Sequence, residues 1–180
     1  MTGERKNIVT DRDFYTRDVL EVAPSLVGKI LACRMDDEWL RWRITETEAY
    51  RGEADLACHA SKGRTARTEV MYHPGGLIYV YLIYGMYWML NVVTGAKDEP
   101  QAALVRGLEG CYGPGRLTRR LHIDKSFYGE DLTQSPRIRI EDDGFIAEYT
   151  TAPRIGVDYA GEWKDKHWRY SLKIPCLRPS

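Results

Sequence analysis

The stretch Leu77–Val93, LIYVYLIYGMYWMLNVV, is the longest apolar run of the chain and decides its fold class. It has 17 residues, which is too short for a membrane-spanning helix. Its composition does not suit such a helix either, because it contains Gly85 and many aromatic residues. Tyrosine, isoleucine and valine favour strands. The run therefore predicts two buried strands, 77–83 and 87–93, and a protruding β-hairpin with large side chains at its tip, Tyr84-Gly85-Met86.

Other segments with strand character lie on both sides of this run. We expect further strands at 29–35, 39–47, 102–108 and 168–174, and a second hairpin in which 136–141 and 145–150 flank the turn Asp142-Asp143-Gly144. Strands that cluster in sequence, with few strand–helix–strand alternations, are typical of an α+β fold with a largely antiparallel sheet. We therefore predict one curved, mainly antiparallel sheet with surrounding helices.

Three helices are expected around these strands. Asp18 is a typical N-cap residue for a helix that ends before Gly28, and Pro24 is expected to divide that helix in two. A second helix is expected at 65–72. A basic helix begins at Gly113-Pro114, because proline is favoured at the first helical position.

Length and composition are typical of a soluble globular protein. The chain has 180 residues, of which 43% are apolar and 29% charged. Residues 1–12 are expected to be a flexible N-terminus, and 13–180 a single domain. No secretory signal is visible, so we expect a cytoplasmic protein without a membrane segment.

The cysteines give no indication of a metal site. Four are present and they lie far apart, without a Cys-x-x-Cys motif or a neighbouring histidine at zinc-ligand spacing: Cys33, Cys58, Cys111 and Cys176. We interpret them as free thiols in a reducing compartment.

The charge is unevenly distributed although the net charge is zero. Residues 60–125 contain nine Lys or Arg against five Asp or Glu, whereas the acidic cluster Glu141-Asp142-Asp143 lies outside this segment. Phosphate binding requires a basic surface. A basic face on an otherwise neutral protein is therefore possible in this segment.

Glu46 and Glu48 are candidates for acid–base chemistry. Residues two apart on a strand share one face, and two neighbouring carboxylates raise one of the two pKa values. The alternative is that both are solvated or paired with Arg41 and Arg43, which have the same strand parity.

An aromatic cage is the second candidate feature. Six ring residues fall close together in the sequence: Tyr50, His59, Tyr79, Tyr81, Tyr84 and Tyr87. Tyrosine is common in strand cores and a lone histidine is often structural, so the aromatic residues alone leave both interpretations open. Large residues at a hairpin tip favour a contact surface, and in a nucleic-acid binder such a residue can wedge between base pairs.

Polar residues within apolar strands are the third candidate feature. Arg106 and Asn91 each need buried partners or face a cleft, and both can orient a ligand or join strands. Arg116, Arg119 and Arg120 on one short helix, followed by Lys125, suit a phosphate backbone, although such a helix face is also commonly just solvated.

Taken together, these motifs resemble the alkyladenine (3-methyladenine, N-methylpurine) DNA glycosylase family from about Phe14 to Ile174. The residues that carry the resemblance are Glu46-Thr47-Glu48-Ala49-Tyr50, His59, the run Tyr79–Tyr87 through Asn91, Arg106-Gly107-Leu108-Glu109, Gly113-Pro114-Gly115-Arg116-Leu117 and Gly161-Glu162-Trp163.

The resemblance implies a monofunctional enzyme that flips alkylated or deaminated purines out of duplex DNA and hydrolyses their glycosidic bond. It implies that Glu48 activates water and that Arg106 positions it. Tyr50 would stack on one face of the base, with His59 and Tyr81 on the other, and Asn91 would exclude the amino group of guanine. Implied contacts with the duplex are intercalation by Tyr84 and backbone contacts by Arg64, Arg67, Gly115, Arg116 and Lys125.

The resemblance further implies a monomer that needs no metal or organic cofactor and has no lyase activity, since no lysine stands in the motif. Such an enzyme would be associated with the nucleoid if bacterial or located in the nucleus if eukaryotic. Only Gly110-Cys111-Tyr112 lies between Glu109 and Gly113, where the family usually has a longer loop.

Two alternatives are a non-catalytic nucleic-acid binding module on the same scaffold and a metal-dependent hydrolase built on Glu46, Glu48 and His59. The intact pair of Glu48 and Arg106 argues against the first, and the lack of a second suitably spaced histidine argues against the second.

Overall fold

Antiparallel pairing connects all the strands of the computed structural model, which describes residues 7–173. The strands are β1 (Asn7–Ile8), β2 (Ile30–Met35), β3 (Glu38–Arg51), β4 (Ile78–Ile83), β5 (Tyr87–Thr94), β6 (Gln101–Leu108), β7 (Cys111–Tyr112), β8 (Ile138–Asp142), β9 (Tyr149–Ala152) and β10 (Arg169–Leu172). The main path of the sheet is β1-β8-β2-β3-β6-β5-β4. The prediction of a single α+β domain with a mainly antiparallel sheet is confirmed.

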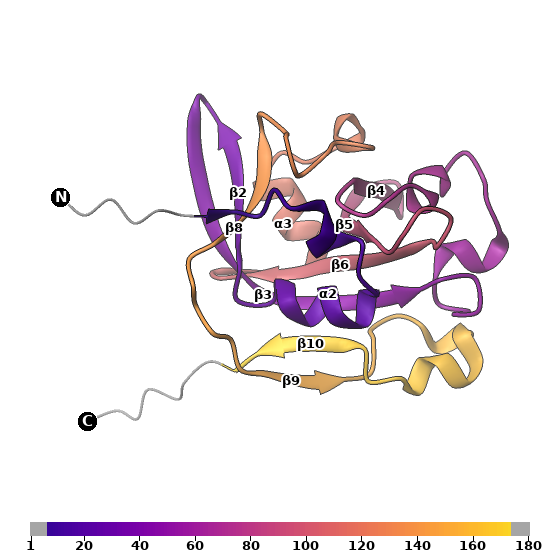
Figure 1. The fold of residues 1–180 in the computed structure, drawn as a ribbon. Coiled ribbons are helices and arrows are strands. Elements are labelled where there is room, and N and C mark those ends of the chain that lie inside the picture. The colour runs from indigo at the N-terminus through magenta and orange to yellow at the C-terminus, as the bar shows by residue number, and fades with distance from the viewer. Residues whose placement is uncertain (1–6, 174–180) are drawn as a thin grey trace, which may run out of the picture.

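The long strand β3 is the centre of the molecule. Its first part pairs with β2, and its second part lies between β6 and β10. Figure 1 shows β3 and β6 side by side across the middle, with the β9–β10 pair below them. Because β3 changes partners along its length, Glu46, Glu48 and Tyr50 lie where three strands meet.

Helices are short, and the two longest α-helices pack against interior strands of the sheet. They comprise α1 (Arg12–Tyr15), α2 (Val19–Leu26), α3 (Pro114–Arg120) and the 3₁₀ segments η1 (His59–Lys62), η2 (Glu69–Tyr72), η3 (Lys125–Phe127) and η4 (Asp158–Asp165). As predicted, Asp18 caps α2 by accepting a hydrogen bond from the Leu20 N–H, and Gly28 follows the helix with a positive φ.

Pro24 does not divide α2, contrary to the sequence prediction. The proline is the sixth of eight residues, so its missing N–H removes only one hydrogen bond near the end of the helix. The buried face that contains Val19, Val22, Ala23 and Leu26 keeps the helix on the sheet.

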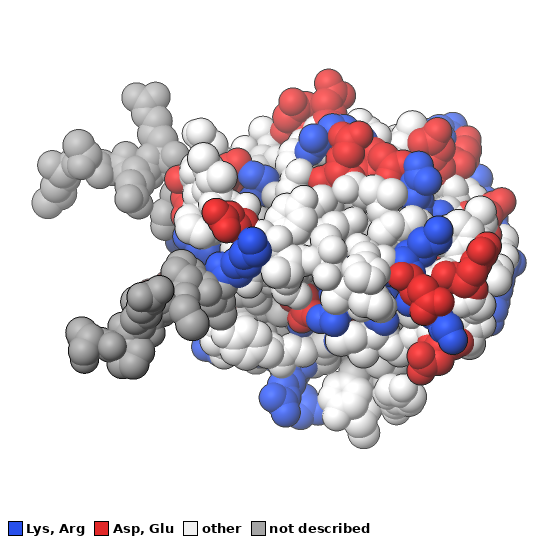
Figure 2. Space-filling model, turned by 90° about the horizontal axis from the view of Figure 1, so that it is seen from below, with Lys and Arg blue, Asp and Glu red and all other residues white. Residues whose placement is uncertain are grey.

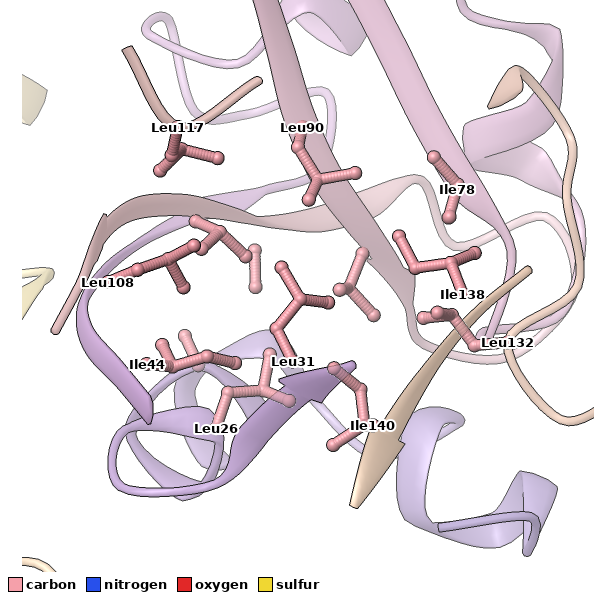
Figure 3. Packing of buried hydrophobic residues seen from close by; sticks show 14 of the residues in the cluster. Leu26, Leu31, Ile44, Ile78, Leu90, Leu108, Leu117, Leu132, Ile138 and Ile140 are labelled. Carbon is pink, nitrogen blue, oxygen red and sulfur yellow. The ribbon is translucent and has the colours of Figure 1, made fainter. Parts of the chain in front are cut away.

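One large apolar core lies between α2, α3 and the sheet. Figure 3 shows Leu26, Leu31, Ile44, Leu108 and Leu117 packed together from these elements. Burying each such side chain contributes about 1.5–3 kcal/mol. This core makes β3 and β6 a rigid base for the polar residues that they carry.

The predicted second hairpin at 136–150 is wrong. β8 pairs with β1 and β2, whereas β9 pairs with β10, so the two strands do not pair with each other. Asp142 and Asp143 form ion pairs with Lys29 and Arg43 instead of closing a tight turn. The segment between the strands is extended and connects two edges of the sheet.

The helix predicted at 65–72 is limited to its last turn, η2. The Thr68 hydroxyl accepts a hydrogen bond from the Thr65 N–H and donates one to the Gly63 carbonyl. Side-chain bonds of this kind compete with helical backbone bonds, so residues 65–68 form turns.

The N-terminal prediction concerns residues only partly described. Asn7–Ile8 pairs with β8, and Val9 donates a backbone hydrogen bond to Ile140. The flexibility expected for 1–12 stays a prediction. Between residues 7 and 173, no helix is long and apolar enough to cross a membrane. Ile174 and Cys176 lie outside the described residues.

Candidate active site

A cavity of about 400 Å³ opens between β3, β4, β5, β6 and the loops around residues 57–59 and 155–159. Six of the predicted site residues line it: Tyr50, His59, Tyr81, Tyr84, Asn91 and Arg106. Pro114, the first residue of α3 and part of the Gly113–Leu117 motif, lines it as well. Residues as far apart in the sequence as Tyr50 and Arg106 therefore meet in one place, as the resemblance implied. The volume is within the range of small-molecule sites.

Aromatic rings form one wall of the cavity. The rings of His59 and Tyr81 are 4.5 Å apart at 71°, and Tyr79 lies 5.3 Å from Tyr81. The Tyr79 hydroxyl is 2.9 Å from Nδ1 of His59. Burial, followed by the positive charges of Arg67 and Lys62, lowers the pKa of His59 to about 4, so the ring is neutral at physiological pH.

Asn91 is buried on β5 at the bottom of the cavity. Its Nδ2 donates to the carbonyl oxygens of Tyr79 and Met89, at 3.2 and 3.4 Å. Two backbone partners hold the amide in place, so it cannot turn away from a ligand.

Glu48 is completely buried and lies behind the cavity wall. Its Oε2 accepts a 2.6 Å hydrogen bond from the Tyr50 hydroxyl, and its Oε1 accepts a 2.8 Å bond from the Ile155 N–H. Tyr50 and Ile155 both line the cavity, whereas Glu48 itself does not. The carboxylate therefore contacts the pocket through its immediate partners.

Burial raises the pKa of Glu48, although several neighbours act against it. Arg106, the Tyr50 hydroxyl and the Ile155 N–H lower the pKa, whereas Glu46 raises it further. A carboxylate with a raised pKa and hydrogen-bond donors on both oxygens has the properties of a general base.

Arg106 reaches both glutamates because the β3–β6 pairing is irregular at this point. Glu46 pairs with Gly107 and Thr47 with Val105, so Arg106 is an unpaired residue in a β-bulge. Its Nε lies 3.5 Å from Oε1 of Glu48 and 3.8 Å from Oε1 of Glu46. Bulges commonly redirect a side chain next to active sites.

The alternative prediction, that Glu46 and Glu48 pair with Arg41 and Arg43, is wrong. Arg41 binds Glu141, and Arg43 binds Asp143. Glu46 is instead held by Arg169 of β10, at 2.9 Å.

The hairpin tip and α3 border the mouth of the cavity. Tyr84 is 87% exposed with a φ of 51°, and Met86 is 59% exposed. Gly115 packs against Tyr87 of the hairpin so closely that an added Cβ would lie 2.7 Å from the ring. The two elements are thereby fixed relative to each other.

The predicted cations differ in how free their charges are. Arg64 forms ion pairs with Glu69 and Asp98. Arg67 lies over the Tyr81 ring at 5.1 Å, and Arg116 and Lys125 are exposed; within residues 7–173 none of these three has an acidic partner. On the face in Figure 2, basic and acidic side chains are mixed around a largely uncharged centre.

Sequence reasoning missed the third side of the site. Ile155, Gly156, Val157 and Tyr159 line the cavity. Ile155 contributes its backbone N–H. Because nearly every residue has one, the residue type gives no indication of this role. Among the described residues, no three His, Cys, Asp or Glu side chains lie close enough to hold a metal ion, so Glu46, Glu48 and His59 do not form such a group.

The family model described as methylpurine-DNA glycosylase (MPG) matches residues 13–112 and 109–174. The chain belongs to the methylpurine-DNA glycosylase family. This membership confirms the predicted resemblance and makes the chain a DNA repair glycosylase, a hydrolase that acts on DNA.

Relatives of similar length support this membership. Three of them carry the name "Putative 3-methyladenine DNA glycosylase". The protein from Psychrobacter cryohalolentis is 41% identical over 90% of this chain and 91% of its own. The one from Methanocella arvoryzae is 43% identical over 94% and 95%, and the one from Legionella pneumophila (strain Lens) is 43% identical over 90% and 93%.

The two segments matched by the methylpurine-DNA glycosylase model meet at 109–112, where the sequence predicted a shortened loop. Here β7 folds back on β6, with Gly107 opposite Tyr112, and α3 begins two residues later. The short connection places α3 directly beside the hairpin.

Proposed function

We propose that this chain removes damaged purines from duplex DNA by monofunctional hydrolysis, with Glu48 as the base that activates water. The observation that carries the proposal is the position of Glu48, fully buried and held by two groups of an aromatic cavity, Tyr50 and Ile155. A binding module gains nothing from a buried carboxylate with a raised pKa.

Arg106 is proposed to position the attacking water. Its Nε is too far from Glu48 for a direct hydrogen bond and has no other partner among the described residues. The side chain also lines the cavity. We propose that a water in the cavity beside the Arg106 guanidinium accepts a hydrogen bond from it and reaches Glu48 when the substrate is bound.

The purine has to leave the helix before this chemistry is possible, which costs a few kcal/mol and less at a damaged pair. We propose that the β4–β5 hairpin protrudes toward the DNA and that Tyr84 occupies the vacated space. Arg67, Gly115, Arg116 and Lys125 would contact phosphates, and Arg64 would contribute less because two acids share its charge.

The cavity is proposed to hold the flipped base between Tyr50 on one side and His59 and Tyr81 on the other. Electron-rich rings favour cationic alkylated purines, by roughly 0.5–2 kcal/mol for each ring. The fixed amide of Asn91 is proposed to exclude the amino group of guanine by contact.

As the glycosidic bond lengthens, the sugar becomes positively charged, and an ionised Glu48 both stabilises it and accepts a proton from water. Inverting glycosidases use a carboxylate in the same way. No lysine is among the described cavity-lining residues, so no amine is available there for a Schiff base. We therefore propose that the enzyme leaves an intact abasic strand. From the family resemblance we also propose that it acts as a monomer and uses no metal.

A single excision experiment tests this proposal. The protein is incubated, in parallel with and without chelator, with duplex oligonucleotides that carry one hypoxanthine or ethenoadenine, and half of each sample is then treated with alkali. We expect strand scission only after alkali for the wild type, and none for Glu48→Gln.

Other outcomes would contradict the proposal in distinguishable ways. Tight binding without scission for both proteins would indicate a binding module. Scission without alkali would indicate a lyase, and loss of activity with chelator would indicate a metal-dependent reaction.

A further inference from the structure

A buried ion pair, Asp55–Arg154, lies directly behind the proposed catalytic wall. Arg154 Nη1 donates to Oδ2 of Asp55 at 2.6 Å and Nη2 donates to Oδ1 at 2.9 Å. Both side chains are completely buried. Paired bidentate bonds of this kind fix distance and orientation together.

The two partners come from loops that follow different strands. Asp55 lies just beyond the end of β3 and is held there by the N–H groups of Arg51 and Ala57. Arg154 begins the loop between β9 and η4, which Figure 1 shows in yellow below the end of β3. The ion pair therefore connects this loop to β3.

Arg154 also contacts the site itself. Its Nη1 donates to the Ala49 carbonyl, between Glu48 and Tyr50, and its guanidinium lies 4.9 Å from the centre of the Tyr50 ring. The next residue, Ile155, supplies the N–H that binds Glu48. Arg154 and Ile155 thus contact all three residues of the segment Glu48–Tyr50. They hold the Glu48 carboxylate, the Ala49 carbonyl and the Tyr50 ring.

The pair cannot act by adding net charge to the pocket, because the Asp55 carboxylate neutralises the guanidinium at contact distance. Four N–H groups of Arg154 have acceptors, the fourth being the carbonyl of Trp163 at 3.1 Å. Nearly all the donor capacity of Arg154 is used to hold this loop in place.

We propose that Asp55 and Arg154 are positioning residues for excision: they hold the Ile155 N–H against Glu48 and the Tyr50 ring against the cavity. This inference rests on the proposed role of Glu48. Its consequence is that loss of the pair slows the chemical step more than it weakens DNA binding, because Tyr84 and the phosphate-facing cations lie elsewhere.

The test measures single-turnover excision from a hypoxanthine-containing duplex at increasing enzyme concentration, for Asp55→Asn, Arg154→Met, the double variant and Arg154→Lys. Asp55→Asn and Arg154→Met each leave a buried charge without its partner, whereas the double variant of these two substitutions removes both charges. We therefore expect the melting temperature to recover in the double variant. The maximal rate should stay at least tenfold below wild type, with less than a threefold change in half-saturating enzyme.

Two controls separate this inference from stability effects and from the proposed function. Arg41→Met disturbs another buried carboxylate, Glu141, away from the cavity, and should lower stability without changing the maximal rate. Arg154→Lys keeps the positive charge but cannot form the bidentate hydrogen bonds with Asp55. This variant should excise faster than Arg154→Met.

The outcomes that overturn the inference are distinct. A double variant whose rate recovers together with its melting temperature shows a purely structural pair, as does a variant whose rate equals wild type while Glu48→Gln is inactive. If Glu48→Gln itself excises normally, the proposed function fails first.

Discussion

The hydroxyl of Tyr50 donates a 2.6 Å hydrogen bond to Glu48 from two residues further along the same strand. The strand period places both side chains on one face, so the ring can line the cavity while its hydroxyl reaches back to the carboxylate. Tyr50, which is proposed to stack on the flipped purine, is therefore also a direct hydrogen-bond partner of Glu48, the proposed proton acceptor.

This bond predicts that Tyr50→Phe keeps most base stacking but slows excision. A hydrogen bond to a charged group is worth about 1.5–3 kcal/mol, so we expect single-turnover rates to fall by about tenfold or more. Affinity for the damaged duplex should change little. A wild-type rate in Tyr50→Phe together with a large loss in Tyr50→Ala would show that stacking, and not the hydroxyl, is the important contribution.

The raised pKa of Glu48 predicts a trade-off between activity and stability. In the proposed reaction the ionised form of Glu48 accepts the proton, so excision should decline as the pH falls through a pKa above the ordinary 4.5. Because folding raises this pKa, the stability contributed by Glu48 is present below 4.5 and is lost as the pH rises through the folded value.

Glu48→Gln should consequently be more stable than wild type at pH 7, by about 1–2 kcal/mol, and no more stable at pH 4. Urea unfolding at the two pH values measures this difference. A variant less stable than wild type at pH 7 would contradict the cost that we assign to the buried charge.

His59 predicts a pH effect of opposite sign. Its pKa of about 4 lies below the ordinary 6.5, so its contribution to stability is present above 6.5 and is lost as the pH falls toward 4. Between pH 7 and pH 5 the wild type should lose about 2 kcal/mol more than His59→Gln. Denaturant titrations of both proteins at these pH values test the expectation, and equal losses would refute it.

Tyr84→Ala should weaken binding to damaged duplex without unfolding the protein. Stacking of an aromatic side chain on a base is worth about 1–3 kcal/mol, which corresponds to a loss of affinity of about fivefold to 150-fold. Because the side chain is 87% exposed, the melting temperature should not change. Ile146→Ala, at an equally exposed site far along the chain, is the matched control, and unchanged affinity for Tyr84→Ala would count against intercalation.

Arg64 and Arg116 should differ in their effect on salt dependence. Each phosphate contact contributes about 0.9 to the slope of log K against log salt. Arg116→Ala should reduce the slope by about one, whereas Arg64→Ala should reduce it by less than half as much, since Glu69 and Asp98 already neutralise that side chain. Equal slopes for the two variants would show that Arg64 changes partners on binding.

The strands that carry the site could be predicted because their residue types have strong intrinsic preferences. The β4–β5 hairpin follows directly from its tyrosines and valines, and it brings Tyr81, Tyr84 and Asn91 to the cavity. By contrast, 136–150 satisfied the pattern of a hairpin, yet its strands found other partners at the sheet edges. Pairing over long distances is decided by packing, which a local pattern does not contain.

The site could be predicted where function resides in side chains and not where it resides in backbone geometry. Glu48, Tyr50 and Arg106 are visible as residue types in unusual places. The bulge that redirects Arg106 is not, because it depends on the register of two strands. The Ile155 N–H is equally invisible, since every residue except proline has one.

The pairing of Arg169 with Glu48 has a consequence for how this protein is made. The carboxylate emerges from the ribosome more than a hundred residues before β10, and until then one edge of its strand and one of its oxygens are open to water. A ribosome-bound chain that ends before residue 154 has Tyr50, His59 and Tyr81 of the pocket but not the loop that holds the carboxylate. With the role proposed for Glu48, a nascent chain is expected to excise bases only after Arg154 and Ile155 have been added.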